Sequence, residues 1–201
     1  VAVDFGMPMG PLRLVDEIGI DVARHAGAAL HGAFGDRLQP ARPLVAIAEA
    51  GRLGRKGASG FYRYEDDHAA RVDPSVYAAL GLGGARERGP EPSREAIRDR
   101  LILSMINEAA RALQEGIVAS AADVDLAMVM GTGFPPFRGG LLELADEEHP
   151  RALIDRLRKY EQEAGPRFSP APLLDELARS ERGFYDVFPE GSSRPLGSGS
   201  R

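Results

Sequence analysis

The sequence predicts a mainly α-helical protein, and three observations support this fold class. Apolar residues recur mostly three and four positions apart along the 201 residues, which is the period of an amphipathic helix. Alternating apolar and polar runs, which would indicate half-buried strands, are nearly absent. Glycine and proline gather at a few places and mark the ends of the helical segments. With 43% apolar residues, the chain can form one compact domain or two small ones.

The first part of the chain predicts three helices and a glycine-rich loop. Pro11 suits the first turn of a helix that begins near Gly10, and a second helix from Asp21 keeps one apolar face as far as Gly35. His25 lies on that helix, and we expect it to be a half-buried packing residue rather than a proton-transfer group. A short helix ends at Gly51. Four glycines in residues 51–64 then predict a structured loop or a short hairpin.

The second part of the chain predicts a longer helical domain. Residues 81–93 concentrate glycine, proline and charge, so we expect an exposed linker between domains at 1–80 and 94–188. Ser93 is placed to cap a long helix that stops before Gly116, and Ser120 to cap a second helix that ends at the turn 131–133. Further helices are predicted at about 139–147, 150–164 and 171–180, and a disordered tail at 189–201.

The chain also contains an internal repeat. Residues 5–16 read FGMPMGPLRLVD and residues 131–146 read GTGFPPFRGGLLELAD. With a three-residue insertion they align at four pairs: Gly6 with Gly133, Pro8 with Pro135, Gly10 with Gly140, and Asp16 with Asp146. Two helices precede this segment in the second copy and are missing from the first, so we expect the first repeat to be truncated at its N-terminus. Such a turn can wall a ligand pocket, but the residues alone favour a turn that only redirects the chain.

Composition excludes several classes of function. A net charge of −5 with scattered basic residues argues against a nucleic-acid partner. No apolar run approaches the roughly 18 residues of a membrane span, so we expect a soluble, cytoplasmic protein without a transmembrane segment. The absence of cysteine excludes disulfides, thiolate catalysis and Cys-ligated zinc. The four histidines show no metal-ligand spacing, so no metal site is predicted.

Three motifs, in chain order, resemble a known family. They read FGMPMGPLRLVDEIGIDV, GRLGRKGASGFYRYE and ILSMINEAARALQEGIVASAADVDLAMVMGTGFPPFRGGLLELAD. Together they look like the C-terminal region of 3-hydroxyacyl-CoA dehydrogenases, over about residues 3–148. The duplication is similar to that in multifunctional fatty-acid β-oxidation α subunits, where an enoyl-CoA hydratase domain and an NAD-binding domain precede two such copies. Single-copy relatives instead pair these domains across a dimer. The resemblance therefore implies two tandem helical domains of this C-terminal type, the first truncated at its N-terminus.

The same resemblance implies an activity and its partners. The family oxidises a 3-hydroxyacyl-CoA to the 3-ketoacyl-CoA and passes hydride to NAD. Its catalytic His–Glu pair and its NAD site lie in an upstream Rossmann domain that this sequence lacks, and LGLGGA at 80–85 is a weak match to a dinucleotide fingerprint. We therefore expect no catalytic or cofactor-binding residue here, and no activity of the chain alone. The implied partners are the acyl-CoA substrate, the Rossmann domain, and a thiolase-type β subunit or a second copy in a homodimer.

The resemblance also assigns candidate substrate-binding residues. Met7, Pro8, Met9, Gly10 and Pro11 match the family's Gly-aromatic-Pro-Met-Gly-Pro turn, which faces the substrate cleft, so they would shape the acyl-CoA site. Met130 stands just before GTGFPP, where many relatives carry an aromatic residue that approaches the substrate. A methionine keeps the apolar contact but cannot form a phenol hydrogen bond.

Two departures and one basic cluster leave alternatives open. Asp99 occupies the place of a family asparagine that touches substrate or cofactor, and we interpret it as a solvated first-turn carboxylate. Arg52, Arg55 and Lys56 could bind a CoA phosphate, but the interpretation that they hold the glycine loop is favoured. Asp99 and Met130 also support the alternative that the chain is a non-catalytic helical interaction or assembly module.

Overall fold

A computed structural model describes residues 1–65, 68–82 and 91–191, with the side chains of residues 68 and 69 left undescribed. Most of the predicted linker and tail, and part of the segment 80–85, lie outside these residues. The chain divides into two compact units. One contains Met9–Ser93; the other combines Val3–Pro8 with the chain from Arg94 onward. Residues 3–8 therefore pack with the chain from Arg94 onward rather than with the sequence that follows them, which the sequence did not predict.

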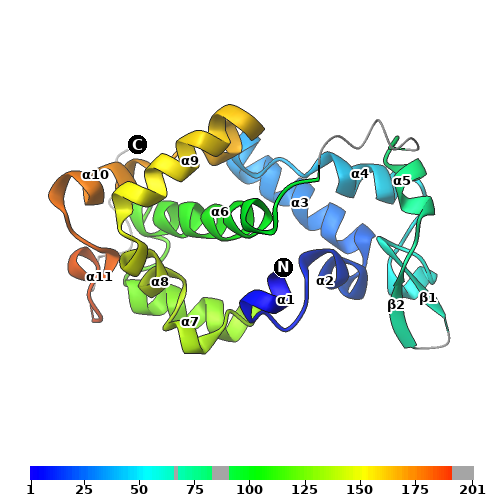
Figure 1. The fold of residues 1–201 in the computed structure, drawn as a ribbon, viewed down its shortest axis with the longest axis horizontal. Helices are drawn as coiled ribbons and strands as arrows, with labels where there is room; N and C mark the ends of the chain where they lie inside the picture. Colours follow the sequence, from blue (N-terminus) through cyan, green and yellow to red (C-terminus); the bar gives the residue numbers. More distant parts are fainter. Residues whose placement is uncertain (66–67, 83–90, 192–201) are drawn as a thin grey trace. The chain divides into compact units, whose positions relative to one another are not determined.

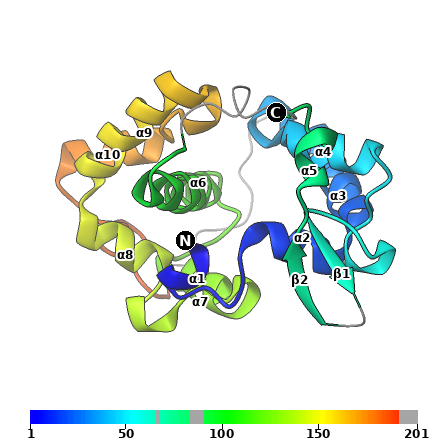
Figure 2. The same cartoon turned by 45° about the vertical axis from the view of Figure 1, so that its right-hand side comes forward.

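The unit Met9–Ser93 is a set of helices beside one hairpin (Figures 1 and 2). Its elements are α2 (Pro11–Ile18), α3 (Ile20–Phe34), η1 (Gly35–Leu38), α4 (Arg42–Glu49), η2 (Arg55–Gly57), β1 (Tyr62–Glu65), β2 (His68–Val72) and α5 (Ser75–Ala79). The strands are antiparallel, with Tyr62 opposite Val72 and an irregularity between Arg63 and Glu65. The helices expected near Gly10, after Asp21 and before Gly51 are confirmed. The hairpin extends past the predicted loop, and neither β2 nor α5 was predicted.

The core of this unit is small. Its buried apolar residues in the described part of the chain are Ile20, Ile47 and Val76, with partly buried side chains around them. The apolar face predicted on α3 is exposed to solvent: Val22 is 50% exposed and Leu30 is 47% exposed. His25 is also exposed, and its Nδ1 donates a hydrogen bond to the Asp21 carbonyl at 2.7 Å. The expectation of a half-buried His25 was wrong, because no element of this unit within the described residues covers that face of α3.

The other unit is a helical bundle built around α6. Its elements are α1 (Ala2–Phe5), α6 (Arg94–Gln114), α7 (Ala121–Thr132), η4 (Pro136–Arg138), α8 (Leu141–Glu148), α9 (Pro150–Ala164), η5 (Pro166–Phe168), α10 (Pro172–Ser180) and α11 (Phe184–Val187). The helix α6 contacts α8, α9 and α10, and lies among them in both views (Figures 1 and 2). Its apolar side chains Leu103, Ile106 and Leu113 are almost completely buried there.

Local signals define the ends of α7 and α9, as predicted. Ser120 Oγ accepts a hydrogen bond from the Asp123 backbone N–H at 3.1 Å and caps α7, and Gly133 ends that helix in the left-handed conformation. The predicted range 150–164 coincides with α9, which begins at a proline and ends before Gly165. Inside the bundle, the buried Asn107 side chain donates to the Ser169 carbonyl at 2.9 Å and accepts from the Ala171 N–H at 2.7 Å. This amide therefore joins α6 to the segment before α10.

Candidate functional site

The predicted substrate-facing turn is divided between the two units. Met7 and Pro8 belong to the bundle built around α6, whereas Met9, Gly10 and Pro11 begin the other unit. Met7 is half-buried and packs against the core of the bundle, while Pro8 is exposed. Gly10 precedes Pro11 as the N-cap of α2, without a side-chain cap. The structure thus brings Met7 and Pro8 together on one body.

The two glycine-proline turns of the repeat contact each other reciprocally. A Cβ placed on Gly6 would lie 2.9 Å from the ring of Pro135, and a Cβ on Gly133 would lie 2.7 Å from the ring of Pro8. Both glycines also have positive φ, at +116° for Gly6 and +70° for Gly133. Each glycine therefore receives the proline of the other turn, in the manner of a two-fold contact. No side chain larger than hydrogen fits at either position.

Arg138 reinforces this contact. Its Nε donates a hydrogen bond to the Phe5 carbonyl at 3.1 Å. Its guanidinium carbon lies 4.1 Å from the centre of the Phe5 ring and 5.4 Å from that of Phe137. The Phe5 ring packs edge-on against Phe134 at 5.7 Å between ring centres. Sequence reasoning missed both Arg138 and Phe137, although both lie within the repeated motif.

Met130 lies on the exposed side of α7. Its side chain is 78% exposed, and Leu126, one turn earlier on the same helix, is 63% exposed. Phe137, in the following turn, is 75% exposed. Buried side chains occupy the opposite side of α7, at Ala121 and Val124. Met130 is therefore available for an apolar contact, and its role in substrate binding stays a prediction.

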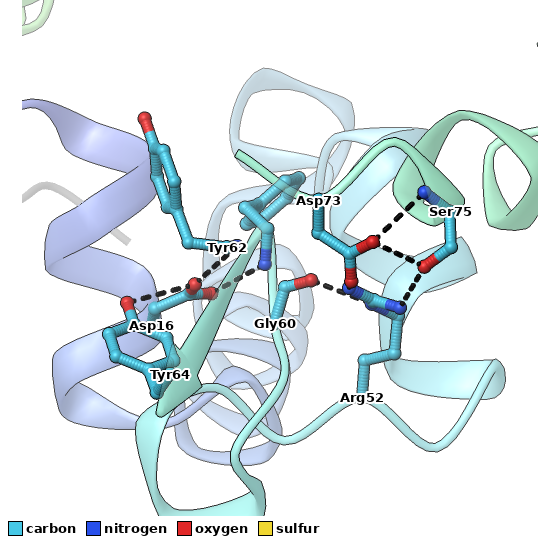
Figure 3. A network of polar contacts seen from close by, with 8 residues as sticks. Asp16, Arg52, Gly60, Tyr62, Tyr64, Asp73 and Ser75 are labelled. Atoms are coloured by element: carbon cyan, nitrogen blue, oxygen red, sulfur yellow. Dashed lines mark hydrogen bonds and ion pairs between the residues drawn. The ribbon is translucent and has the colours of Figure 1, made fainter. Parts of the chain in front are cut away.

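A buried carboxylate anchors the glycine loop of the first unit (Figure 3). Asp16 is completely buried and accepts hydrogen bonds from the backbone N–H groups of Phe61 at 2.8 Å and Tyr62 at 2.9 Å. The Tyr64 hydroxyl donates to the same carboxylate at 3.1 Å. Burial, and then the Asp16 charge, raise the pKa of Tyr64 above its ordinary value. Any side chain on Gly60 would overlap the Asp16 carboxylate.

The same arrangement recurs in the other unit. Asp146 accepts from the backbone N–H groups of Phe184 at 2.7 Å and Tyr185 at 3.1 Å, and a side chain on Gly183 would overlap its carboxylate. Burial raises the pKa of the Asp146 carboxyl despite these two donors. The triplet Gly-Phe-Tyr occurs at 60–62 and again at 183–185. The sequence analysis aligned Asp16 with Asp146 but missed this recurring partner.

A third carboxylate, the buried Asp125, caps α8. Asp125 accepts from the Leu142 N–H at 2.7 Å, the Glu143 N–H at 3.0 Å and the Tyr185 hydroxyl at 2.9 Å. Burial, and then the hydrogen bond to Asp125, raise the pKa of Tyr185. These three carboxylates are thus held by backbone N–H groups, and Asp16 and Asp125 also by tyrosine hydroxyls, so they serve the fold.

The basic residues of the glycine loop contact other parts of their own unit. Arg52 donates to the Gly60 carbonyl at 2.6 Å and pairs with Asp73 at 2.5 Å (Figure 3). The hydrogen bonds from Arg52 and then Ser75 lower the pKa of Asp73 to about 2. Arg55 pairs with Glu17 at 2.9 Å, and Lys56 pairs with Asp21 at 2.5 Å. These contacts favour the loop-holding interpretation over phosphate binding.

Asp99 is not the solvated carboxylate that the sequence predicted. Its side chain is 8% exposed and lies 3.4 Å from both Arg98 and Arg156. The prediction was wrong because Arg156 is far away in sequence and reaches Asp99 from α9. Asp99 is an ion-pairing residue between two helices.

The described residues contain no group of three or more histidine, aspartate or glutamate side chains that could hold a metal ion. Within the same part of the chain, no helix combines the length and the apolar character needed to cross a membrane.

Comparison with known proteins identifies the family. The model of the 3-hydroxyacyl-CoA dehydrogenase C-terminal domain matches residues 1–64 and 97–184. A fatty acid oxidation complex subunit alpha from Shewanella loihica is 38% identical over 185 residues, which cover 92% of this chain and 26% of that protein. The subunit of the same name from Acinetobacter baumannii is 37% identical over 187 residues, covering 90% of this chain and 26% of that one. The chain thus spans about a quarter of the length of these relatives.

Solved structures show the same fold. A crystal structure of 3-hydroxybutyryl-CoA dehydrogenase from Escherichia coli aligns with a TM-score of 0.66 at 23% identity, over 88% of this chain and 52% of the other. The dehydrogenase part of a multifunctional enzyme from Caenorhabditis elegans aligns with a TM-score of 0.62 at 22% identity, over 87% and 40%. Because the family model matches most of the chain, in two segments that each contain one glycine-proline turn, the chain belongs to the 3-hydroxyacyl-CoA dehydrogenase C-terminal domain family.

Proposed function

We propose that this chain is the substrate-side helical region of an NAD-dependent 3-hydroxyacyl-CoA dehydrogenase in fatty-acid β-oxidation. The observation that carries the proposal is the match to the family model, whose two matched ranges include both glycine-proline turns. The names of the relatives, fatty acid oxidation complex subunits alpha, support the pathway. Because the chain spans about a quarter of those relatives, the oxidation belongs to a longer polypeptide.

In this proposal the chain's own residues bind the acyl-CoA substrate and take no part in the chemical step. Met7, Pro8, Met9, Gly10, Pro11 and Met130 form apolar walls of the acyl-CoA site. The carboxylates described above are engaged by backbone N–H groups, tyrosines or arginines, so none is placed to act as a general base. NAD, which accepts the hydride, and the catalytic base are supplied by a Rossmann domain outside this sequence. The chain alone is therefore inactive.

We further infer that the two units are tandem copies. The helices α2, α3 and α4 begin at Pro11, Ile20 and Arg42, and α8, α9 and α10 begin 130 residues later, at Leu141, Pro150 and Pro172. The paired helices have equal or nearly equal lengths of 8, 15 and 8 or 9 residues. The Asp–Gly-Phe-Tyr contact in each unit supports the same relation.

Exposure differs between the two copies in a way that supports a truncated first copy. Leu12 is 48% exposed, whereas its counterpart Leu142 is fully buried. Leu14 is 45% exposed and its counterpart Leu144 is 8% exposed. In the second copy α6 and α7 contact α8 and cover it. We infer that an equivalent helix pair covers α2 in the longer polypeptide, because burying the exposed half of each leucine would contribute about 1 kcal/mol.

The partners follow from the same proposal. The substrate is an acyl-CoA, and the neighbouring domain is the Rossmann domain. The word "complex" in the relatives' names supports a further subunit, for which we propose a thiolase-type β subunit, with a homodimer as the other arrangement. We place this assembly in the cytoplasm.

Reconstitution tests the proposal. The chain would be expressed in one polypeptide with an NAD-binding domain of the family and the helix pair inferred above. We expect NADH formation with short-, medium- or long-chain 3-hydroxyacyl-CoA, and none from the 201-residue chain alone. A folded reconstituted polypeptide that oxidises none of these substrates would refute the proposal.

The second candidate is a non-catalytic assembly module. The exposed apolar side chains of Met130 and Phe137, and the engagement of Asp99 in ion pairs, favour it. It predicts that the assembled polypeptide has no affinity for acyl-CoA. Calorimetric titration with a 3-hydroxyacyl-CoA separates the two candidates, because saturable binding excludes the module.

A further inference from the structure

The substrate-facing turn of the first repeat is held by the second repeat, and we propose that Arg138 is the positioning residue that fixes it. This inference rests on the proposed function, because the turn matters for catalysis only if Met7 and Pro8 face the acyl-CoA. On this inference the second copy supports substrate binding without itself binding a ligand.

Three contacts carry the inference. The Nε of Arg138 holds the Phe5 carbonyl at 3.1 Å, so the backbone immediately before Gly6 and Met7 is fixed. The guanidinium covers the Phe5 ring, which is only 8% exposed and belongs to the core of the bundle. No carboxylate of the described residues pairs with Arg138, so its contacts are with the Phe5 backbone and two aromatic rings. The planar guanidinium group of arginine can donate to the carbonyl and lie over the ring at the same time, whereas the ammonium group of a lysine is a point charge that suits this pair of contacts less well.

The glycine contacts fix the other side of the turn. Pro8 lies against Gly133, where any Cβ would be 2.7 Å from the proline ring. Gly133 also adopts φ +70°, which disfavours other residues. Arg138 and Gly133 therefore hold the two ends of the segment from Phe5 to Pro8, and Met7 lies between them.

The first experiment uses the 201-residue chain and measures amide hydrogen exchange of residues 3–8. In Arg138→Met we expect exchange at Phe5 and Gly6 to become about tenfold faster, with an intermediate rate in Arg138→Lys. Arg100→Met is the matched control, because Arg100 also lies over an aromatic ring, that of Phe168, at 5.7 Å. Equal exchange of residues 3–8 in Arg138→Met and Arg100→Met would overturn the positioning role.

The second experiment measures steady-state oxidation by the longer polypeptide that carries this sequence. For Arg138→Met and Gly133→Ala we expect the KM for 3-hydroxyacyl-CoA to rise about three- to tenfold, with kcat and the KM for NAD within about twofold. Arg138→Lys should recover part of the lost affinity. Faster exchange with an unchanged KM would refute the link to substrate while leaving the proposed function intact. An inactive wild-type polypeptide would instead refute the proposed function.

Discussion

The contact between Asp146 and the Gly-Phe-Tyr triplet yields a sharp stability prediction through Gly183→Ala. The backbone at Gly183 has φ −87°, which alanine adopts without strain, so the change acts only through the added Cβ. That Cβ would overlap the Asp146 carboxylate, which has to move away from the N–H groups of Phe184 and Tyr185. Leaving a buried donor unsatisfied costs about 1–3 kcal/mol. We expect a loss of about 2–4 kcal/mol in the free energy of unfolding of this unit.

Urea denaturation followed by far-UV circular dichroism measures this loss. In a thermal melt of the same variant, the expected decrease in Tm for a unit of this size is on the order of 10 °C. Gly131→Ala is the matched control, because Gly131 lies in α7 with open space around it, and alanine there should stabilise by about 0.5–1 kcal/mol. If Gly183→Ala unfolds with the wild-type midpoint, the carboxylate does not hold the triplet as argued.

Three further predictions concern buried polar groups. Asn107→Ala should destabilise the bundle by about 2–3 kcal/mol, because it leaves the Ala171 N–H without its acceptor. Ser104→Ala serves as the control in the same urea titration, because it removes only an exposed hydrogen bond within α6. Tyr185→Phe should cost about 1–2 kcal/mol by removing the hydrogen bond to a buried carboxylate, and a thermal melt unchanged from wild type would contradict this. The pKa of Asp73 is lowered from 3.8 to about 2, so the stability that this group contributes is present above pH 3.8 and is lost as the pH falls through about 2. Unfolding midpoints measured across this range should fall in the wild type more than in Asp73→Asn.

The sequence predicted the elements that depend on local chemistry. The start of α7 at a serine cap and the limits of α9, between a proline and a glycine, follow from backbone rules that act within a few residues. The long helix α6 followed from its apolar period. The hairpin strand β2 and the short helix α5 were not predicted, because segments of five residues have too few positions to show a period.

The sequence failed where partners come from distant segments. The apolar period of α3 predicted a packing face, but a period shows only that a face is apolar and does not supply the element that covers it. Asp99 was misjudged for the converse reason: a charged residue near a helix start suits solvent, unless another helix brings an arginine such as Arg156 to it. In both cases the missing information was the neighbour in space.

For the candidate site, too, the sequence indicated the residues but not the contacts that hold them in place. The family resemblance of the motif indicated Met7 and Pro8. Alignment of the repeat paired Gly6 with Gly133, the two glycines that contact the prolines. Neither observation could show that the paired residues contact each other, because a repeat specifies which residues are alike and not which are close. Yet the likeness and the contact are connected physically, because two like turns that contact each other reciprocally each present a glycine to the other's proline. A loss of one glycine therefore disturbs one of the two contacts, and Gly133→Ala tests the contact on which Pro8 depends.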